Sequence, residues 1–143
     1  MQSEADKLIA MEKHRVNGSV WRYPGLGGSI CIPLISFDKR ENFNLDISRG
    51  KINLSKGTYQ NRARKIIVLV RLDLGGPPHR NPDDVEISSP HLHLYREGYG
   101  DKWAMPIPTG KFSNISNLWQ VLKDFMDFCN ITEPPIIQKG LST

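Results

Sequence analysis

Two histidines and a tyrosine alternate within residues 89–106 of the chain. His91, His93 and Tyr95 occupy every second position, so in a β-strand their side chains lie on one face. The intervening leucines point to the opposite face and are sufficient to bury the strand in a core. The polar face is therefore available for chemistry. Imidazole is the side chain that most readily exchanges protons near neutral pH.

Residues 66–74 form the most hydrophobic run of the chain and predict a central strand. Arg71 and Asp73 interrupt the far end of this run, so one face of the strand becomes polar there. If this strand pairs antiparallel with the histidine strand, Arg71 and Asp73 lie within reach of His91 and His93. We therefore expect a polar cluster at one end of a sheet.

The connection between these two strands, residues 75–89, is longer than a hairpin requires and is rich in turn-forming residues. It carries His79 and Arg80, so three of the four histidines fall within fifteen residues of one another. The turn that follows the histidine strand adds further polar groups to the expected site: Tyr95, Tyr99, Asp101 and Lys102. Such a concentration is difficult to attribute to sheet packing alone.

Metal-independent cleavage of RNA is the reaction that this cluster fits best. Attack by a 2′-hydroxyl requires a base, an acid and cations that stabilise the charge on the phosphate. We expect His91 and His93 to be the acid and base, and Arg71 and Lys102 to bind the phosphate. The leading hypothesis is thus an endoribonuclease that uses neither a metal nor another cofactor.

A basic segment before the central strand suggests a path for an RNA backbone. Its cationic side chains would contact phosphates, while nearby aromatic rings would stack on bases. The net charge of +4 is compatible with RNA or a nucleoprotein complex as partner. The residues expected to bind nucleic acid or a protein partner are Arg62, Arg64, Lys65, His79, Arg80, Tyr95, Arg96 and Tyr99.

Two other interpretations of the cluster stay open. A His-x-His pair on a strand has a common metal-ligand spacing, and His79 or Asp73 would supply the third ligand. Alternatively, the histidines occupy the solvated face of a sheet, and Arg71 and Asp73 form a surface ion pair worth less than about 1 kcal/mol.

Two amphipathic helices are predicted near the ends of the chain. The first spans residues 3–16 with Ser3 as N-cap, and the second begins after Asn114 or Ser116 and reaches Cys129. Segments with strand patterns lie between them, at residues 20–23, 29–37, 43–48, 66–74 and 91–96, and a returning strand follows the turn at residues 97–100. The expected fold class is α+β, with an antiparallel sheet of five to seven strands and one helix from each end of the chain covering its apolar face.

The length of 143 residues fits a single domain, which we place at residues 1–131. Residues 132–143 contain two adjacent prolines and no periodic pattern, which predicts a flexible tail. No apolar run approaches the ~20 residues of a membrane span, and the first residues lack a signal peptide pattern, so a cytoplasmic protein is expected. Cys31 and Cys129 are then expected to be buried free thiols.

Residues 71–83 (RLDLGGPPHRNPD) and 90–104 (PHLHLYREGYGDKWA) resemble a family of small uncharacterised bacterial and prophage proteins. The family has no established activity, so the resemblance implies no catalytic residue. It does imply a mobile-element setting, where small proteins act as toxins, antitoxins or inhibitors of host defence. The alternative to an endoribonuclease is therefore a non-catalytic inhibitor or antitoxin that binds a protein or nucleoprotein partner.

Overall fold

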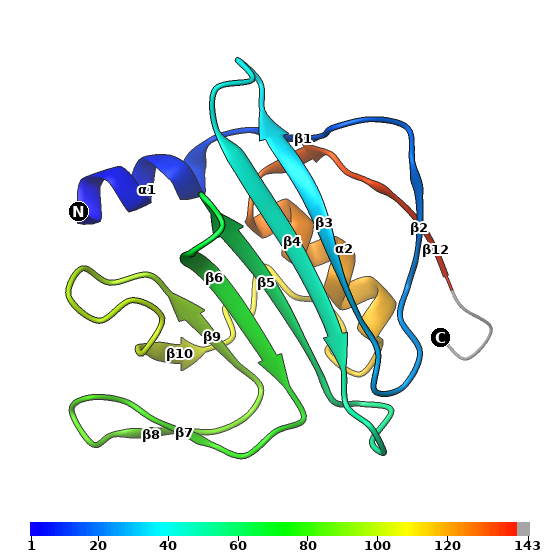
Figure 1. Ribbon diagram of the computed structural model, residues 1–143. Helices are drawn as coiled ribbons and strands as arrows, with labels where there is room; N and C mark the ends of the chain where they lie inside the picture. The colour runs from blue at the N-terminus through cyan, green and yellow to red at the C-terminus, as the bar shows by residue number, and fades with distance from the viewer. Residues whose placement is uncertain (140–143) are drawn as a thin grey trace.

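An eight-stranded sheet runs through the computed structural model, which describes residues 1–139 (Figure 1). All neighbouring strands are antiparallel except β1 and β11, which pair in parallel. In spatial order the strands are β10 (Ala104–Pro106), β9 (His91–Leu94), β6 (Ile67–Leu74), β5 (Gly57–Ala63), β4 (Asn42–Arg49), β3 (Ser29–Ser36), β1 (Lys13–Arg15) and β11 (Ile131–Glu133).

Two smaller strand pairs and two helices complete the described chain. The parallel pair consists of β2 (Val20–Arg22) and β12 (Ile136–Gln138), and the antiparallel hairpin consists of β7 (His79–Arg80) and β8 (Glu86–Ile87). The helices are α1 (Gln2–Ala10) and α2 (Leu118–Phe128). The α+β fold class predicted from the sequence is confirmed.

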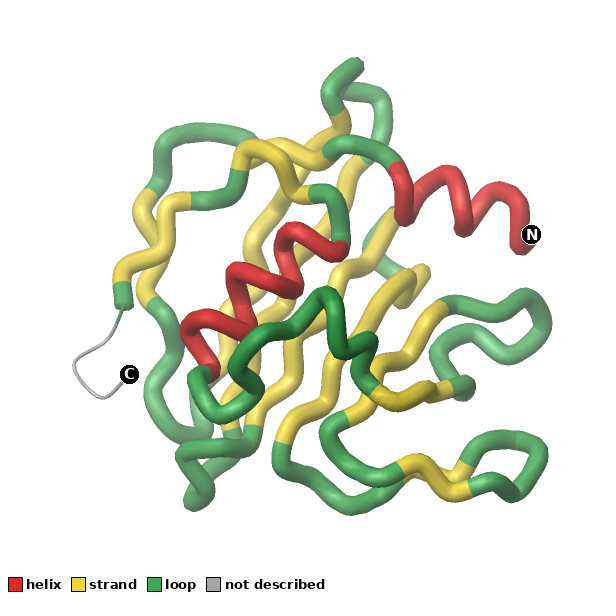
Figure 2. The backbone as a smooth tube through the Cα atoms, turned by 180° about the vertical axis from the view of Figure 1, so that it is seen from behind, coloured by secondary structure: helices red, strands yellow, loops and turns green. Residues whose placement is uncertain are grey.

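The two faces of the central sheet differ in polarity. Along β4, Phe43, Leu45 and Ile47 are buried while the alternate positions are only half-buried, and β5 shows the same alternation. Helix α2 lies behind the sheet in Figure 1 and across it in the reverse view of Figure 2. Tyr59 of β5 donates a hydrogen bond from its hydroxyl to the Leu118 carbonyl oxygen at 2.8 Å, which ties α2 to the core face. The opposite face carries the polar residues.

The sheet has eight strands rather than the five to seven predicted, and two of them, β1 and β11, come from segments predicted to be helix and tail. The first helix ends at Ala10 rather than at residue 16, and residues 13–15 turn into β1 beside β3. At the other end of the chain, residues 131–133 form β11 beside β1. Pairing with strands far away in sequence outweighs the helical pattern that the first segment shows.

The segment predicted to be a flexible tail, residues 132–143, forms strands as far as Gln138. Residues 131–133 and 136–138 pair in parallel with β1 and β2, and Ile131 is buried. The two prolines lie between these strands, where no backbone donor is required. Residues 140–143, the rest of the predicted tail, lie outside the described residues.

The two helices occupy different positions relative to the sheet. Asn117, rather than Asn114 or Ser116, caps α2, and its side chain accepts a hydrogen bond from the Gln120 backbone amide. Helix α1 lies near the β5–β6 turn, where Arg64 forms an ion pair with Glu4. We expected both helices to cover the apolar face of the sheet. In the structure α2 lies across the centre of the sheet, whereas α1 lies near its edge at the β5–β6 turn (Figure 2).

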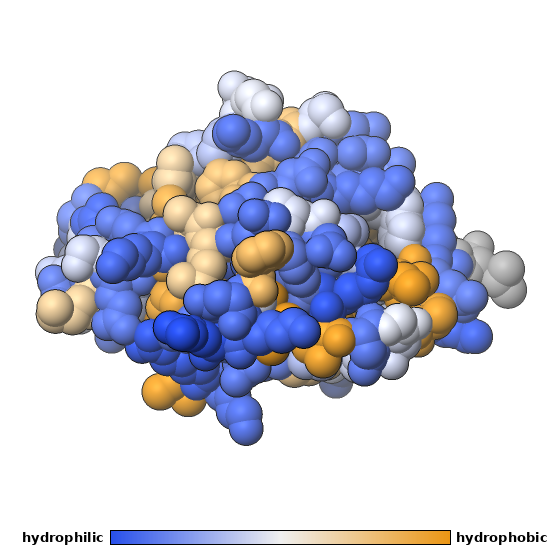
Figure 3. All heavy atoms as spheres, turned by 90° about the horizontal axis from the view of Figure 1, so that it is seen from above, coloured by the Kyte–Doolittle hydropathy of each residue, from blue (hydrophilic) through white to orange (hydrophobic). Residues whose placement is uncertain are grey.

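The surface seen from above is mostly hydrophilic, and its hydrophobic side chains form small separate patches (Figure 3). Neither helix of residues 1–139 has the length and apolar character needed to cross a membrane. Cys31 and Cys129 are both free thiols as predicted, but only Cys129 is buried; the expected burial of Cys31 is wrong, since its side chain lies exposed on β3.

Lys13 is fully buried, which is rare for a lysine. Its Nζ donates to the carbonyl oxygens of Ile9 at 2.9 Å, Met11 at 2.9 Å and Cys129 at 2.7 Å. These bonds use all three ammonium protons and join the end of α1 to the end of α2. Burial lowers the pKa of Lys13 to about 8, so the side chain is still mainly charged at neutral pH.

We expect Lys13→Met to lower the free energy of unfolding by about 3 kcal/mol, because three carbonyl oxygens lose their donor. Urea denaturation followed by circular dichroism measures this loss. Lys111→Met at an exposed position is the matched control and should change stability by less than about 0.5 kcal/mol. Equal stability of the two variants would contradict the role assigned to Lys13.

Candidate functional site

The pairing of β6 with β9 assembles the polar cluster. Asp73 lies opposite His91, and Arg71 lies opposite His93, in an antiparallel register. Leu72, between the two polar residues of β6, is fully buried on the core face. The antiparallel pairing predicted from the sequence is confirmed, and the cluster lies on the sheet face that points away from α2.

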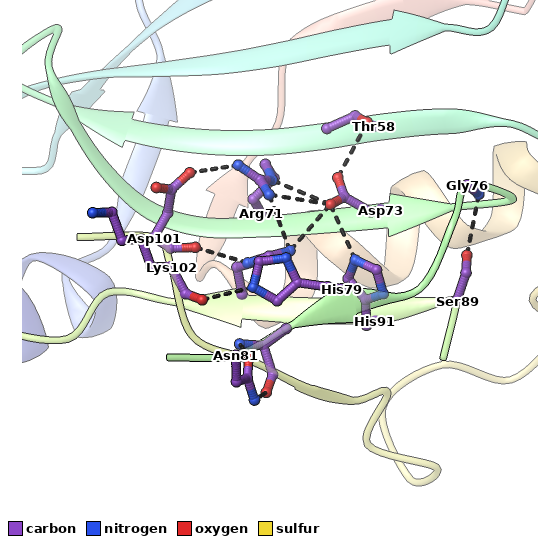
Figure 4. Close-up of polar contacts among 12 residues, drawn as sticks. Thr58, Arg71, Asp73, Gly76, His79, Asn81, Ser89, His91, Asp101 and Lys102 are labelled. Carbon is purple, nitrogen blue, oxygen red and sulfur yellow. Dashed lines mark hydrogen bonds and ion pairs between the residues drawn. The ribbon is translucent and has the colours of Figure 1, made fainter. Parts of the chain in front are cut away.

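The Asp73 carboxylate is the centre of this cluster (Figure 4). Its Oδ2 accepts a hydrogen bond from Arg71 Nη2 at 3.2 Å and lies 3.3 Å from His91 Nε2 and 3.1 Å from His93 Nε2. Thr58 of the neighbouring β5 donates to Oδ1 at 3.2 Å. Burial opposes ionisation, but the contacts with His93 and Arg71 outweigh it and hold the pKa of Asp73 well below its usual range.

His93 is fully buried, and both of its ring nitrogens are engaged. Nδ1 donates to the Asp101 carbonyl oxygen at 2.7 Å, which leaves a lone pair on Nε2. Arg71 Nη2 donates to this nitrogen at 3.0 Å, and Arg71 Nη1 forms an ion pair with the Asp101 carboxylate. His93 thereby fixes the turn after β9 to the sheet, and its ring has no free nitrogen for a substrate.

His79 comes from the β7–β8 hairpin and lies beside His91 (Figure 4). Its ring centroid is 4.6 Å from that of His93 and 5.8 Å from that of His91. His79 Nε2 donates to the Lys102 carbonyl oxygen at 2.7 Å. The long connection thus brings a third imidazole to the cluster, as the sequence suggested.

His91 is almost fully buried, with 3% of its surface exposed. Burial lowers the pKa of His91, and the neighbouring Asp73 charge offsets this effect only in part. Its Nδ1 is buried and makes no hydrogen bond within residues 1–139. The imidazole is therefore oriented by Asp73 through Nε2.

A pocket of about 450 Å³ opens beside the cluster. It combines two cationic side chains, two hydroxyl groups, two imidazoles and one carboxylate with the start of the β6–β7 loop. Its lining residues are Ser48, Lys56, Thr58, Arg71, Asp73, Leu74, Gly76, Pro77, Pro78, His79 and His91. Such a mixture of donors and cations suits an anionic ligand.

Gly75 allows the loop after β6 to approach the β4–β5 turn. Its φ of +68° lies in the left-handed region, and a Cβ atom there would be 2.9 Å from the Ser55 carbonyl oxygen and 3.1 Å from Lys56 Cα. This close approach places Lys56 at the pocket. Sequence reasoning missed Lys56, Ser48 and Thr58, because their position depends on cross-strand register rather than on any local pattern.

The four residues expected to be catalytic divide into two groups. Arg71 and His91 line the pocket, whereas His93 lies behind it and the exposed Lys102 contributes its carbonyl oxygen to His79. His79, which we expected only to bind a partner, lines the pocket as well.

The basic segment expected to bind RNA is largely paired with acidic side chains. Arg62 binds the Asp46 carboxylate through Nε and Nη2, and Arg64 bridges Glu41 and Glu4. Lys65 is exposed. The positive charge that this segment offers to a phosphate backbone is therefore smaller than the sequence suggests.

The remaining predicted binding residues lie outside the pocket lining. Arg96 stacks on the Trp103 ring with its guanidinium 4.0 Å from the ring centroid, and the Tyr99 ring packs edge-on against the same indole. Tyr95 packs partly against the core, and Arg80 forms an ion pair with Glu86 at 3.5 Å. Tyr99 is 44% exposed, so the turn after β9 presents an aromatic surface.

One group of residues in the cluster has the composition of a metal site. Asp73, His91 and His93 each offer one ligand atom, and these three atoms lie within 4.8 Å of one another. Of the two residues that the sequence offered as a third ligand, Asp73 belongs to this group and His79 does not.

The Asp46–Arg62 pair makes a prediction about acid stability. Burial opposes ionisation of Asp46, but hydrogen bonds from Arg62 and Gln60 outweigh it and lower the pKa of Asp46 below its ordinary 3.8. A carboxyl group with a lowered pKa in the folded state stabilises the fold above its ordinary pKa. That stability is lost as the pH falls through the pKa that the carboxyl group has in the folded state.

We therefore expect the stability of the wild-type chain to fall more steeply below about pH 4 than that of Asp46→Asn. Urea denaturation at a series of acidic pH values measures the two slopes. Asp127→Asn, at an exposed position, should follow the wild type and serves as the control. Parallel slopes for wild type and Asp46→Asn would refute the assignment.

Comparison with known proteins finds one match, to a protein family. Residues 1–131 match the sequence model of a family of unknown function, in agreement with the resemblance to an uncharacterised family. Comparisons with curated proteins and with solved structures find no match. The geometry of the pocket is therefore the basis for assigning a function.

Proposed function

The chain belongs to DUF6978, a family of unknown function, and from the geometry of its pocket we propose that it cleaves RNA without a metal cofactor. One observation carries this proposal: a single pocket brings the imidazoles of His79 and His91 beside the cations Lys56 and Arg71. Cleavage of a phosphodiester through the 2′-hydroxyl requires these kinds of groups together.

The scissile phosphate binds between Arg71 and Lys56. Two carboxylates, those of Asp73 and Asp101, hold the Arg71 guanidinium from different sides, so its orientation is set before a substrate arrives. The hydroxyl groups of Ser48 and Thr58 add neutral donors to the same wall. This arrangement stabilises the extra negative charge that develops on the phosphate during the reaction.

The two pocket histidines carry the proton transfers. One imidazole accepts the proton of the 2′-hydroxyl while the 2′-oxygen forms its bond to phosphorus. The other imidazole donates a proton to the 5′-oxygen as the bond from phosphorus to that oxygen breaks. The products are a 2′,3′-cyclic phosphate and a 5′-hydroxyl, and the two histidines exchange protonation states.

This assignment changes two of the roles expected from the sequence. His79 replaces His93 in the acid–base pair, because His93 is fully buried with both nitrogens engaged. Lys56 replaces Lys102 as the second cation, because Lys56 lines the pocket. His93 becomes a positioning residue that holds Arg71 and the turn after β9.

We expect His91→Ala and His79→Ala each to lower the rate of RNA cleavage by about 10²- to 10⁴-fold, because each removes one proton-transfer group. The assay follows a labelled RNA incubated with untagged protein, with and without EDTA. His14→Ala removes the fourth histidine, which lies on β1 away from the pocket, and should cleave at the wild-type rate. An RNA with 2′-deoxyribose at the cleaved position should resist the enzyme.

Cleavage that persists in EDTA and stops in both pocket variants supports the proposal, provided that circular dichroism shows native folding. Full turnover by a folded His91→Ala variant would refute the catalytic assignment. Absence of cleavage by the wild-type chain would refute the enzyme itself and favour a binding role.

The surface formed by Arg96, Tyr99 and Trp103 favours a second candidate function. A guanidinium stacked on an indole beside an exposed tyrosine is typical of the residues that dominate protein interfaces. In this case the chain is a non-catalytic inhibitor or antitoxin of a mobile element, and this surface binds its protein or nucleoprotein partner.

For the second function we expect Tyr99→Ala to weaken capture of the partner at least about tenfold, because an exposed aromatic anchor is lost. Affinity purification of the wild-type chain, Tyr99→Ala and His91→Ala from the native cells, followed by mass spectrometry, compares the three. Recovery with wild type and His91→Ala but not with Tyr99→Ala supports a binder. Recovery that depends on His91 alone would contradict it.

A further inference from the structure

We infer that Asp73, His91 and His93 bind a divalent transition metal such as Zn²⁺ or Co²⁺, and that the bound ion inhibits the proposed cleavage. Two imidazoles and one carboxylate match the ligand preference of these ions. The ligands come from facing positions of β6 and β9, so the sheet itself holds them together. The inhibition rests on the proposed function, whereas the binding of the metal does not.

The separations of the ligand atoms fit a tetrahedral ion. Metal–ligand bonds of about 2.0–2.2 Å at tetrahedral angles place neighbouring ligand atoms about 3.4 Å apart. Asp73 Oδ2 lies 3.3 Å from His91 Nε2 and 3.1 Å from His93 Nε2. These two separations match a tetrahedral site, and all three ligand atoms lie within 4.8 Å of one another, so side-chain adjustment can bring them around one ion.

The tautomer of His93 is the one that a metal ligand requires. Its Nδ1 donates to the Asp101 carbonyl oxygen at 2.7 Å, as metal-binding histidines commonly do with their other nitrogen. The Nε2 lone pair then faces the Asp73 carboxylate oxygen, and two acceptors at 3.1 Å repel each other unless a cation joins them. The site is thus built around a positive charge.

Arg71 supplies that charge when no metal is bound. Its Nη2 lies 3.0 Å from His93 Nε2 and 3.2 Å from Asp73 Oδ2, so it contacts two of the three metal-binding atoms. A metal ion and Arg71 therefore compete for the same lone pairs. Arg71 also lines the pocket, so the guanidinium can swing into the pocket when a metal ion displaces it.

The pocket leaves one side of the ion open. Asp73 and His91 line it, so water can complete the coordination from that side. An ion bound to His91 Nε2 holds this imidazole as a metal ligand, which takes it out of proton transfer, and the ion also displaces the phosphate-binding arginine. Both effects stop the proposed reaction, so the metal acts as an inhibitor.

Metal binding is measured on untagged protein freed of metal with EDTA and then dialysed. Co²⁺ is titrated in, and its visible absorption and the heat of binding are followed. We expect one ion per chain for the wild type. Asp73→Asn should weaken binding at least about 100-fold because a charged ligand is lost, and Arg71→Met should tighten it about tenfold because the competitor is gone.

The tighter Co²⁺ binding expected of Arg71→Met keeps the test valid if Asp73→Asn does not fold, because misfolding cannot increase the affinity for the ion. His14 is the matched control because it also lies close to carboxylates, 3.3 Å from Glu12 and 3.1 Å from Glu133. His14→Gln and Cys31→Ser should bind Co²⁺ like the wild type. Loss of binding in either control, or unchanged binding in a folded Asp73→Asn, would overturn the site.

The RNA assay separates the inference from the proposed function. Loss of cleavage at one equivalent of Zn²⁺, with recovery in EDTA, supports both. Stoichiometric metal binding without any cleavage of RNA overturns the proposed function and supports the site. Cleavage that resists EDTA, together with no Co²⁺ binding to wild type or Arg71→Met, overturns the metal site and supports the metal-free enzyme.

Discussion

The charge of Asp73 is the constraint on which the arrangement of this site depends. A half-buried carboxylate is costly unless cations and donors surround it. Arg71, His91 and Thr58 meet this requirement, and they come from three adjacent strands. The same contacts orient the arginine and the His91 imidazole, so the reactive groups gain their positions from the need to compensate one charge.

The sheet makes this arrangement possible by separating its two faces. Alternate residues of β4, β5 and β6 pack beneath α2, which leaves the other face free for polar side chains. The β7–β8 hairpin and its His79 then cover part of that polar face. The result is a pocket with a rigid floor of paired strands and a wall formed by a longer connection, a common way of building functional sites.

Arg71 links the two chemistries that we assign to the pocket. In the proposed reaction the guanidinium, held by Asp73 and Asp101, binds a phosphate, and in the proposed metal site the same guanidinium beside His93 stands where the ion would bind. A transition metal and an RNA phosphate therefore require different positions of one side chain. This competition couples metal binding to catalysis without any change in the fold.

The sequence by itself determined the features that depend on local periodicity. The alternation in residues 43–47, the apolar run of residues 66–74 and the placement of His91 and His93 on one face of a strand follow from strand geometry alone. Only the tertiary structure decided the features that depend on distant contacts. Residues 13–15 leave the predicted helix to pair with β3 and β11, and Lys13 donates to the carbonyl oxygen of the distant Cys129. Lys56 reaches the pocket because the loop at Gly75 packs against its turn. No local pattern encodes such long-range contacts.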